Sequence, residues 1–396
     1  MFKNDICVIG GCGHVGLPLA LAFADKGLNV TVHDLNDSAV TMVNEGKMPF
    51  LEAGAEEILK RVINKTLRVA NDPVYISESK FVIVVIGTPV DEHLNPKFNA
   101  INNFFQALMP HFKDNQHIIL RSTVFPGTTE KIRQLLDKNN KKVKLTFCPE
   151  RIAEGKAMEE LCDLPQVVSG FTQKSIDEAS ELFKNLTKDV VPVTPLEAEL
   201  TKLFTNSWRY IQFAIANQFY MLANQHGVDF YKIYNAMRFK YPRTEGFPGP
   251  GFTAGPCLLK DTMQIAAFSN NNFFLGHAAM LINEGLPNYI VQKLKEKNDL
   301  KGKKVGILGM AFKGNNDDIR DSLSYKLKKV LEIEAEEVLC TDVYVKGDGI
   351  KPLAEVLEQA DILILGAPHR EYKTIEYSNK QIMIDIWNYY GKGGLF

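Results

Sequence analysis

The stretch Ile6-Cys7-Val8-Ile9-Gly10-Gly11-Cys12-Gly13-His14-Val15-Gly16 stands near the start of the chain and decides its fold. Its apolar half predicts a buried strand, a helical run from Leu17 to Lys26 follows, and the next strand, Asn29 to His33, ends at Asp34. Glycines allow a tight turn close to a pyrophosphate, a helix N-terminus binds the phosphate charge, and an acid about twenty residues further on holds ribose hydroxyls. The pattern predicts a dinucleotide site at Gly11, Gly13, His14, Val15, Gly16 and Asp34.

The residues after Asp34 indicate which dinucleotide is bound. They are Leu35 and Asn36, with no arginine to pair with a 2′-phosphate. The carboxylate of Asp34 would also repel that phosphate. We therefore expect NAD as the cofactor.

Three further strands, at 81–86, 118–120 and 145–147, each end in a loop of small or polar residues. The loops contain Gly87 to Pro89, Ser122 to Thr129, and Cys148 to Gly155. Ligands in open α/β sheets bind at the carboxyl ends of strands, so these loops should surround the nicotinamide. Turn formation and helix capping would explain the same residues, but Glu150, after a proline at a strand end, is well placed to orient a water.

The segment from Leu196 to His226 contains no glycine or proline before its end and predicts a helix about 45 Å long. A helix of that length should join two lobes and offer a face to a second subunit, so we expect a homodimer through it. Lys202 and Asn206 stand four residues apart and share one face. Such a pair is most often simply solvated, and a catalytic role for it needs support from other motifs.

The stretch from Phe247 to Asp261, Phe-Pro-Gly-Pro-Gly-Phe-Thr-Ala-Gly-Pro-Cys-Leu-Leu-Lys-Asp, places Cys257 after a glycine-rich loop and beside Lys260 and Asp261. Glycines let the loop fold closely around a ligand, and a nearby cation stabilises a thiolate or the oxyanion that its attack creates. Taken alone, a cysteine after such a loop is more often a small buried hydrophobic residue than a nucleophile.

A second strand-loop-helix unit begins after the polar stretch 297–303, with the strand Val305 to Gly309 and the loop that carries Phe312 and Lys313. These two could stack a base and meet a phosphate, or be a core phenylalanine beside a surface lysine. Helical segments at Phe273 to Glu284 and Pro287 to Lys297 precede it. We expect an α/β protein with two Rossmann-like doubly wound lobes joined by a long central helix and a helical middle domain, with boundaries 1–195, 196–298 and 299–396.

Composition bounds the function. The net charge of −1 argues against nucleic acid or an anionic membrane as a partner, and no apolar run is long enough to span a bilayer. Six cysteines are scattered without disulfide or metal-ligand spacing, as expected of reduced thiols, so neither disulfides nor a metal site are expected. With no leader at the N-terminus, we expect a cytoplasmic protein.

The ordered set of motifs resembles the UDP-glucose/GDP-mannose dehydrogenase family over nearly the whole chain. The landmarks are Gly11 to Gly16, Pro49 to Glu52, Gly87 to Pro89, Ser122 with Thr123, Pro149 with Glu150, Glu154 with Gly155, Glu199 to Lys202 with Asn206, Cys257 with Lys260 and Asp261, Gly309 with Phe312 and Lys313, and Asp318 to Arg320. Their joint order and spacing are highly specific.

The resemblance implies a four-electron oxidation of a sugar C6 alcohol to a carboxylate with two NAD used in turn, usually for surface polysaccharide biosynthesis. Lys202, Asn206 and Asp261 would polarise the group that takes the alcohol proton. Cys257 would form a thiohemiacetal and then a thioester, and Glu150 with Thr123 would activate the water that hydrolyses it.

The resemblance also implies ligand-binding residues. NAD would contact Thr88, Ser122, Glu154 and Arg320 besides the glycine loop and Asp34, and the UDP-sugar would contact Arg151, Ile152, Arg243, Phe252, Gly255, Phe312 and Lys313. Cys148-Pro149-Glu150-Arg151-Ile152 is similar to enzymes of UDP-N-acetylhexosamines, whereas Cys257 to Asp261 is similar to UDP-glucose enzymes, and Trp387 replaces a frequent substrate-binding arginine. A UDP-N-acetylhexosamine is slightly favoured over UDP-glucose.

Two alternatives belong to other classes. A two-electron β-hydroxyacid dehydrogenase resembles this architecture and also uses a lysine and an asparagine four residues apart, but it needs neither Cys257 nor the lobe after Asp299. A catalytically silent NAD-binding sensor would have no reason to keep every catalytic group.

Overall fold

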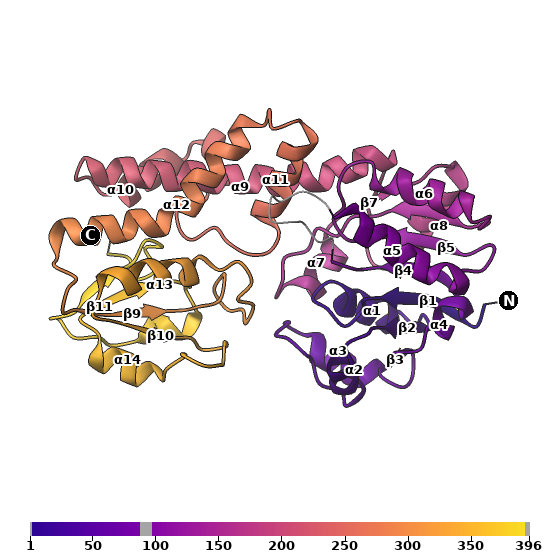
Figure 1. Ribbon diagram of the computed structural model, residues 1–396, viewed down its shortest axis with the longest axis horizontal. Coiled ribbons are helices and arrows are strands. Elements are labelled where there is room, and N and C mark those ends of the chain that lie inside the picture. Colours follow the sequence, from indigo (N-terminus) through magenta and orange to yellow (C-terminus); the bar gives the residue numbers. More distant parts are fainter. Residues whose placement is uncertain (1, 88–96, 393–396) are drawn as a thin grey trace. The chain divides into compact units, whose positions relative to one another are not determined.

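The computed structural model describes residues 2–87 and 97–392, which form two compact units, Met1–Phe204 and Thr205–Phe396 (Figure 1). Each unit has its own parallel sheet and its own core, and each is described by itself. Helix α9 runs from the first unit into the second.

The first unit is built on a six-stranded sheet in the order β3-β2-β1-β4-β5-β6, in which all neighbours are parallel. Its strands are β1 (Asn4–Ile9), β2 (Val30–His33), β3 (Leu67–Ala70), β4 (Ser79–Val84), β5 (His117–Leu120) and β6 (Lys144–Phe147). The chain reverses direction across the sheet between β1 and β4, where this fold class binds its ligand. The predicted doubly wound α/β fold is confirmed.

Helices cover both faces of this sheet because both faces are apolar (Figure 1). Ile6 and Val8 of β1 belong to one buried cluster and Cys7 and Ile9 to the other. The helices are α1 (Gly16–Asp25), α2 (Asp37–Asn44), α3 (Ala55–Val62), α4 (Val74–Glu78), α5 (Phe98–Leu108), α6 (Thr128–Lys138), α7 (Ala157–Asp163) and α8 (Gln173–Phe183), and a small parallel pair, β7 (Gln166–Ser169) and β8 (Val190–Val193), adjoins them.

The second unit contains a four-stranded parallel sheet in the order β10-β9-β11-β12. Its strands are β9 (Lys304–Leu308), β10 (Glu337–Thr341), β11 (Ile362–Leu365) and β12 (Ile382–Ile384), and its helices are α10 (Phe230–Arg238), α11 (Leu258–Phe268), α12 (Phe274–Lys297), α13 (Leu323–Glu334) and α14 (Leu353–Gln359). The predicted second Rossmann-like lobe is thus confirmed.

The predicted long helix is α9 (Pro195–Gln225), which has 31 residues. The prediction of two helical segments after Cys257 was wrong, because α12 is one helix with Pro287 inside it. Proline removes a backbone N–H and usually breaks a helix. Here Leu286, Pro287 and Ile290 are all buried, so packing on both sides of the proline outweighs the lost hydrogen bond.

No helix within residues 2–87 and 97–392 is long and apolar enough to cross a membrane.

Candidate active site

The glycine loop after β1 has the form of a dinucleotide cradle. A Cβ on Gly16 would lie 2.6 Å from the Cα of Gly11, so the absence of a side chain lets α1 pack onto the loop. A Cβ on Gly13 would touch nothing within 4 Å, and this residue is exposed. The loop therefore leaves open space at Gly13, in front of the N-terminus of α1, where a pyrophosphate is expected. Val15 precedes α1 and His14 lies over the ring of Phe50 at 4.0 Å between centroids.

Asp34 follows β2 and reaches back to this loop. Its Oδ2 accepts the backbone N–H of Cys12 at 2.8 Å, and its Oδ1 accepts the N–H of Asn36 at 2.9 Å. The side chain is half-buried, so the carboxylate stays accessible to ribose hydroxyls. Burial, helped by the charge of Asp34, raises the pKa of the Cys12 thiol to about 12, so Cys12 is a neutral part of the cradle. The glycine loop and Asp34 therefore fit NAD.

The loop after β5 carries Ser122 and Thr123, both half-buried, and is fastened to α9 by a residue that the sequence analysis did not single out for a role. The carboxylate of Glu199 accepts the N–H of Gly127 at 2.6 Å and both the N–H and the hydroxyl of Thr129, at 2.8 and 2.6 Å. Burial raises the pKa of Glu199, and the N–H and hydroxyl donors act against that rise. The N-terminal part of α9 is thereby fixed to the start of α6. Thr88, predicted to contact NAD, lies outside the described residues.

Glu150 is buried in a polar network centred on Arg121, a residue that sequence reasoning missed. The Oε2 atom of Glu150 accepts hydrogen bonds from Nε and Nη2 of Arg121, at 3.0 and 2.5 Å. Its Oε1 accepts the backbone N–H groups of Arg151 and Ile152 at 2.7 and 3.0 Å. These four donors match the four lone-pair sites of a carboxylate, so Glu150 must release one of them before it can take a proton from water.

Arg121 is 0% exposed and packs 4.8 Å from the ring of Phe183. Its Nη1 donates to the carbonyl of Cys148 at 3.0 Å and to Oε1 of Gln166 at 2.7 Å. A buried guanidinium needs several acceptors, and the turn after β6 supplies them. A basic residue at the end of β5 and an acid at the end of β6, on neighbouring strands, was the signal in the sequence.

The rest of the turn after β6 is held by acids from elsewhere in the first unit. Glu52 accepts the N–H of Gly155 and of Ala157, both at 2.8 Å, and so fixes the segment that contains Glu154. The Nη2 of Arg151 donates to the carbonyl of Pro165, and burial lowers the pKa of this arginine. Ile152 packs on the apolar core.

In the second unit, Asn206 and Asp261 meet in the interior. The Nδ2 of Asn206 donates to Oδ2 of Asp261 at 2.6 Å, and their exposed fractions are 4% and 0%. Lys260 lies 3.8 Å from the other carboxylate oxygen. Lys202, half-buried, stands one turn before Asn206 on α9, as the sequence predicted. The pairing of Asn206 with Asp261 is therefore a structural fact, which spacing alone could not supply.

Cys257 is exposed at the N-terminus of α11, and its carbonyl accepts the N–H of Asp261 at 2.9 Å. The positive end of a helix favours a thiolate. Burial raises the pKa of Cys7 to about 12 and of Cys148 and Cys340 to about 11. The buried-hydrophobe interpretation of Cys257 is thus wrong. Among the six cysteines, only Cys162 shares its exposure.

The loop before Cys257 is held between α9 and the second sheet. Asn217 of α9 accepts the N–H of Gly251 at 2.8 Å and donates to its carbonyl at 3.1 Å. A Cβ on Gly251 would lie 2.3 Å from the ring of Trp387, and one on Gly255 would lie 2.7 Å from the ring of Phe312. The side chain of Phe252 is buried in the core. Because Gly255 precedes Cys257 by two residues, the ring of Phe312 packs on the loop close to Cys257.

Phe312 and Lys313 stand on the loop after β9, as predicted, with the Nζ of Lys313 5.5 Å from the ring centroid of Phe312. Arg320 forms an ion pair with Asp318, and its Nε lies 2.8 Å from Oδ2. Arg243 is exposed and packs over the ring of Tyr241.

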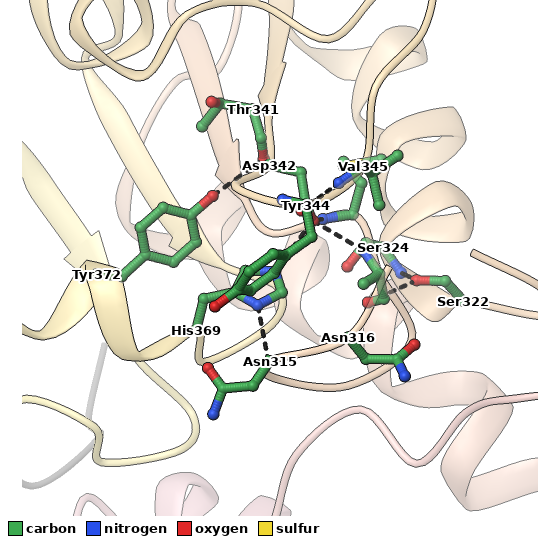
Figure 2. A network of polar contacts seen from close by, with 12 residues as sticks. Asn315, Asn316, Ser322, Ser324, Thr341, Asp342, Tyr344, Val345, His369 and Tyr372 are labelled. Carbon is green, nitrogen blue, oxygen red and sulfur yellow. Dashed lines mark hydrogen bonds and ion pairs between the residues drawn. The ribbon is translucent and has the colours of Figure 1, made fainter. Parts of the chain in front are cut away.

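The same loop rests on a buried pair that the sequence did not reveal, Asp342 and His369 (Figure 2). Both side chains are 0% exposed, and Nε2 of His369 lies 3.0 Å from Oδ2 of Asp342. Burial acts to raise the pKa of Asp342, but the hydrogen bond from His369 and the N–H groups of Val345 and Tyr344 outweigh it and lower the pKa to about 2.

Within residues 2–87 and 97–392, no group of three or more histidine, cysteine, aspartate or glutamate side chains is arranged to hold a metal ion.

Comparison with known proteins accounts for this geometry. Three models of one family match the chain: the NAD binding domain of the UDP-glucose/GDP-mannose dehydrogenase family over residues 4–187, its central domain over 196–284 and its UDP binding domain over 306–392. The chain is 32% identical over 382 residues to a UDP-N-acetyl-D-mannosamine dehydrogenase of Methanocaldococcus jannaschii, covering 94% of this chain and 87% of that protein.

Solved structures agree. A UDP-D-ManNAc dehydrogenase from Pyrococcus horikoshii superposes with a TM-score of 0.86 at 27% identity, covering 94% of this chain and 91% of that one. A UDP-glucose dehydrogenase from Pyrobaculum islandicum gives 0.89 at 25% identity, covering 96% and 94%.

The fold and the site define an NAD-dependent oxidoreductase with a separate lobe for a nucleotide. The chain belongs to the UDP-glucose/GDP-mannose dehydrogenase family, whose members oxidise nucleotide sugars with NAD, and the predicted family, activity and cofactor are confirmed at that level. This membership decides against the β-hydroxyacid dehydrogenase and the silent sensor.

Proposed function

We propose that the protein oxidises the C6 alcohol of UDP-N-acetylmannosamine to the carboxylate, with Cys257 as the nucleophile. The observation that carries this proposal is the exposed thiol at the N-terminus of α11, one turn before Asp261, which is hydrogen-bonded to Asn206. A helix N-terminus and a buried amide-carboxylate pair are suited to a thiolate and to the oxyanion formed by its attack.

In the first oxidation, Lys202, Asn206 and Asp261 hold the C6 hydroxyl through a bridging water or directly, and the alcohol proton leaves toward them. NAD, bound at the glycine loop, supplies the chemistry of hydride acceptance. Gly11, Gly13, His14, Val15, Gly16 and Asp34 hold it, with Thr88, Ser122, Glu154 and Arg320 as further contacts. The product of this step is the C6 aldehyde.

In the second oxidation, the thiolate of Cys257 adds to the aldehyde carbon, because that carbon becomes a good hydride donor only after a nucleophile adds. Lys202 and Asn206 stabilise the resulting oxyanion. A second NAD, held by the same residues of the glycine loop, would accept the hydride, and its loss from this carbon would leave a thioester on Cys257. Water then adds, the C–S bond breaks, and the acid and the thiol are released. Two hydrides leave per sugar, so two NADH are formed and one water is consumed.

For the hydrolysis, we propose Glu150 with Thr123 as the water-binding pair. Arg121 fixes the orientation of Glu150 by its bonds to Oε2, so the proton would be taken at Oε1, where two backbone N–H groups are the present donors. Small movement of the turn at Ile152 would free one lone pair.

The substrate proposal rests on relatives of stated specificity. The M. jannaschii relative is a UDP-N-acetyl-D-mannosamine dehydrogenase, and so is a 31% identical protein of Methanococcus maripaludis that covers 94% of this chain. We propose that the UDP-sugar contacts Arg151, Ile152, Arg243, Phe252, Gly255, Phe312 and Lys313. UDP-glucose is the second candidate, because the P. islandicum enzyme of that name superposes with a slightly higher TM-score, 0.89 against 0.86 for the P. horikoshii enzyme.

We further propose a homodimer through α9. Phe204, Trp208, Ile215, Phe219 and Leu222 are all exposed apolar residues of this helix. At 3.6 residues per turn, they lie within an arc of about 60°, which makes one continuous stripe rather than scattered side chains. We expect Trp208→Glu to convert a dimer to a monomer in light scattering. None of the six cysteines is part of a disulfide, which supports a reducing compartment, and we propose the cytoplasm.

The test of the proposed function is the number of NADH formed per sugar, on a panel of UDP-N-acetylmannosamine, UDP-N-acetylglucosamine, UDP-N-acetylgalactosamine, UDP-glucose and GDP-mannose. Two NADH from UDP-N-acetylmannosamine support the proposal. Two NADH from another member alone would keep the mechanism and replace the substrate, and one NADH would remove Cys257 as the nucleophile.

Thiol labelling provides a matched control inside the chain. Cys257 precedes α11, whereas Cys162 lies in the last turn of α7, where the helix dipole disfavours a thiolate. Iodoacetamide should therefore label Cys257 faster than Cys162, and a UDP-sugar should protect only the former. Equal rates at both would contradict an activated Cys257.

A further inference from the structure

The loop that carries Phe312 is held at both of its ends by the buried pair. Asp342 Oδ2 accepts the N–H groups of Met310 and Ala311 at 2.6 and 3.0 Å, before Phe312. His369 Nδ1 accepts the N–H of Asn315 at 2.9 Å, after it. Phe312, Lys313 and Gly314 lie between these anchors.

The hydrogen bonds fix the tautomer of His369. Because Nδ1 accepts a backbone N–H, the ring proton must be on Nε2, which donates to Asp342 at 3.0 Å. The neutral imidazole thus joins the acid at one end of the loop to the backbone at the other end. Oδ1 of Asp342 is occupied by the N–H groups of Tyr344 and Val345, at 2.8 and 2.9 Å.

Close backbone packing leaves this arrangement little freedom. A Cβ on Gly309 would lie 2.6 Å from the backbone of Ala367, and one on Gly314 would lie 2.4 Å from the carbonyl of Pro368. The loop after β9 and the loop that leads to His369 therefore contact each other backbone to backbone. A change at His369 is expected to reach the loop after β9 rather than to be absorbed by side chains.

The loop in turn meets the segment of the nucleophile, since the Phe312 ring packs on Gly255 two residues before Cys257. We propose that Asp342 and His369 are positioning residues for the nucleotide-sugar: they hold the loop after β9 so that Phe312 and Lys313 are presented to the uridine diphosphate group. This rests on the proposed function, in which those two residues contact the substrate. Neither Asp342 nor His369 touches the ligand, because both side chains are 0% exposed.

Two variants of His369 separate positioning from general stability. His369→Leu fills the space but removes both hydrogen bonds, whereas His369→Gln can accept from Asn315 through its carbonyl and donate to Asp342 through its amide. The matched control is Gln381→Ala. Gln381 donates to the carbonyls of Leu357 and Ala360, at 2.7 and 2.6 Å, just before β12 and thus at the opposite end of the parallel strands.

The experiment measures the Kd of UDP by calorimetry, KM and kcat for the UDP-sugar at saturating NAD, the Kd of NADH by fluorescence, and Tm. We expect His369→Leu to raise the Kd of UDP and the KM about tenfold or more, with kcat within about threefold and NADH binding unchanged. His369→Gln should restore most of the affinity, and Gln381→Ala should lower Tm without changing KM.

The outcomes are distinct. An unchanged Kd of UDP in a folded His369→Leu variant overturns the positioning role, and so does an equal rise in Gln381→Ala. If the parent oxidises no UDP-sugar yet its UDP affinity depends on His369, the proposed function fails and the positioning of the UDP-binding loop stands.

Discussion

Each of the two parallel sheets has an aspartate directly after its second strand in the chain, where it meets the loop that follows the first strand. We call this place the corner of the sheet, and the two aspartates have different surroundings there. In the first, Gly10 donates its N–H to His33 and Asp34 follows; in the second, Gly309 donates to Thr341 and Asp342 follows. Both acids accept an N–H from the glycine loop and one from two residues further on, Asn36 for Asp34 and Tyr344 for Asp342. Only the second corner adds a histidine.

The difference lies in what remains for a ligand. Asp34 is half-buried and accepts one N–H from the glycine loop, so it can still bind ribose hydroxyls. Asp342 is 0% exposed and has its oxygens occupied by the loop, by His369 and by the following turn. A strand-end acid therefore indicates a ribose site only where nothing else covers it.

The largest expected effect is on stability. Asp342→Asn replaces a buried carboxylate that accepts five N–H donors by an amide that turns donors toward some of them, and we expect a loss of about 3 to 5 kcal/mol in the free energy of unfolding of the second unit. Asp34→Asn should lose less than about 1 kcal/mol. Both tryptophans, Trp208 and Trp387, belong to the second unit, so their fluorescence reports urea unfolding of that unit, and circular dichroism follows the first unit as well. Equal losses at the two corners would break the comparison.

The second largest effect should be a pH dependence of the free energy of unfolding that is caused by Asp342. Its folded-state pKa is lowered from 3.8 to about 2, so it stabilises the fold above its unfolded pKa and this contribution is lost as the pH falls through about 2. The shift corresponds to about 2.5 kcal/mol. The gap in unfolding free energy between parent and Asp342→Asn should shrink by about 2 kcal/mol between pH 6 and pH 2, because half of the carboxylate is still ionised at pH 2. A gap that is independent of pH would mean that the carboxylate charge is not what stabilises the corner.

Much of this comparison could be predicted from the sequence, because it rests on local patterns. The glycine loop, Asp34, the long helix and the second strand-loop-helix unit all follow from periodicity and from short spacings. Lys202 and Asn206 were placed on one face by their separation along a helix.

What could not be predicted depends on long-range contacts. His369 lies 27 residues from Asp342, and Asn206 lies 55 residues from Asp261, so no local spacing brings them together. Arg121 stood at a strand end without any motif, and only burial reveals that it holds Glu150. Pro287 misled for the opposite reason, since a strong local signal was overridden by packing on both sides of it.

Glycine substitutions should give smaller effects. They should distinguish a glycine that leaves room for the cofactor from one that packs against the protein itself. Gly16→Ala forces a Cβ to 2.6 Å from the Cα of Gly11 and should lower the unfolding free energy of the first unit by about 2 kcal/mol. Gly13→Ala meets open space and should leave stability within about 0.5 kcal/mol while weakening NAD binding. Urea unfolding and NADH titration of both variants are the measurements. A destabilised Gly13→Ala would mean that the open space is not reserved for the cofactor.

The smallest expected effect concerns Asp34, the aspartate whose carboxylate stays accessible. Asp34→Asn keeps the side-chain volume but replaces a charged acceptor by a neutral one, so we expect the Kd of NAD to rise about tenfold, which equals about 1.4 kcal/mol. The penalty against a 2′-phosphate should fall at the same time, so the preference for NAD over NADP should narrow. Asp342→Asn serves as the control, since its acid is covered and should not affect NAD binding. If Asp342→Asn weakened NAD binding as much as Asp34→Asn, the second corner would be coupled to the cofactor, and its acid could no longer be regarded as a support for the UDP-binding loop alone.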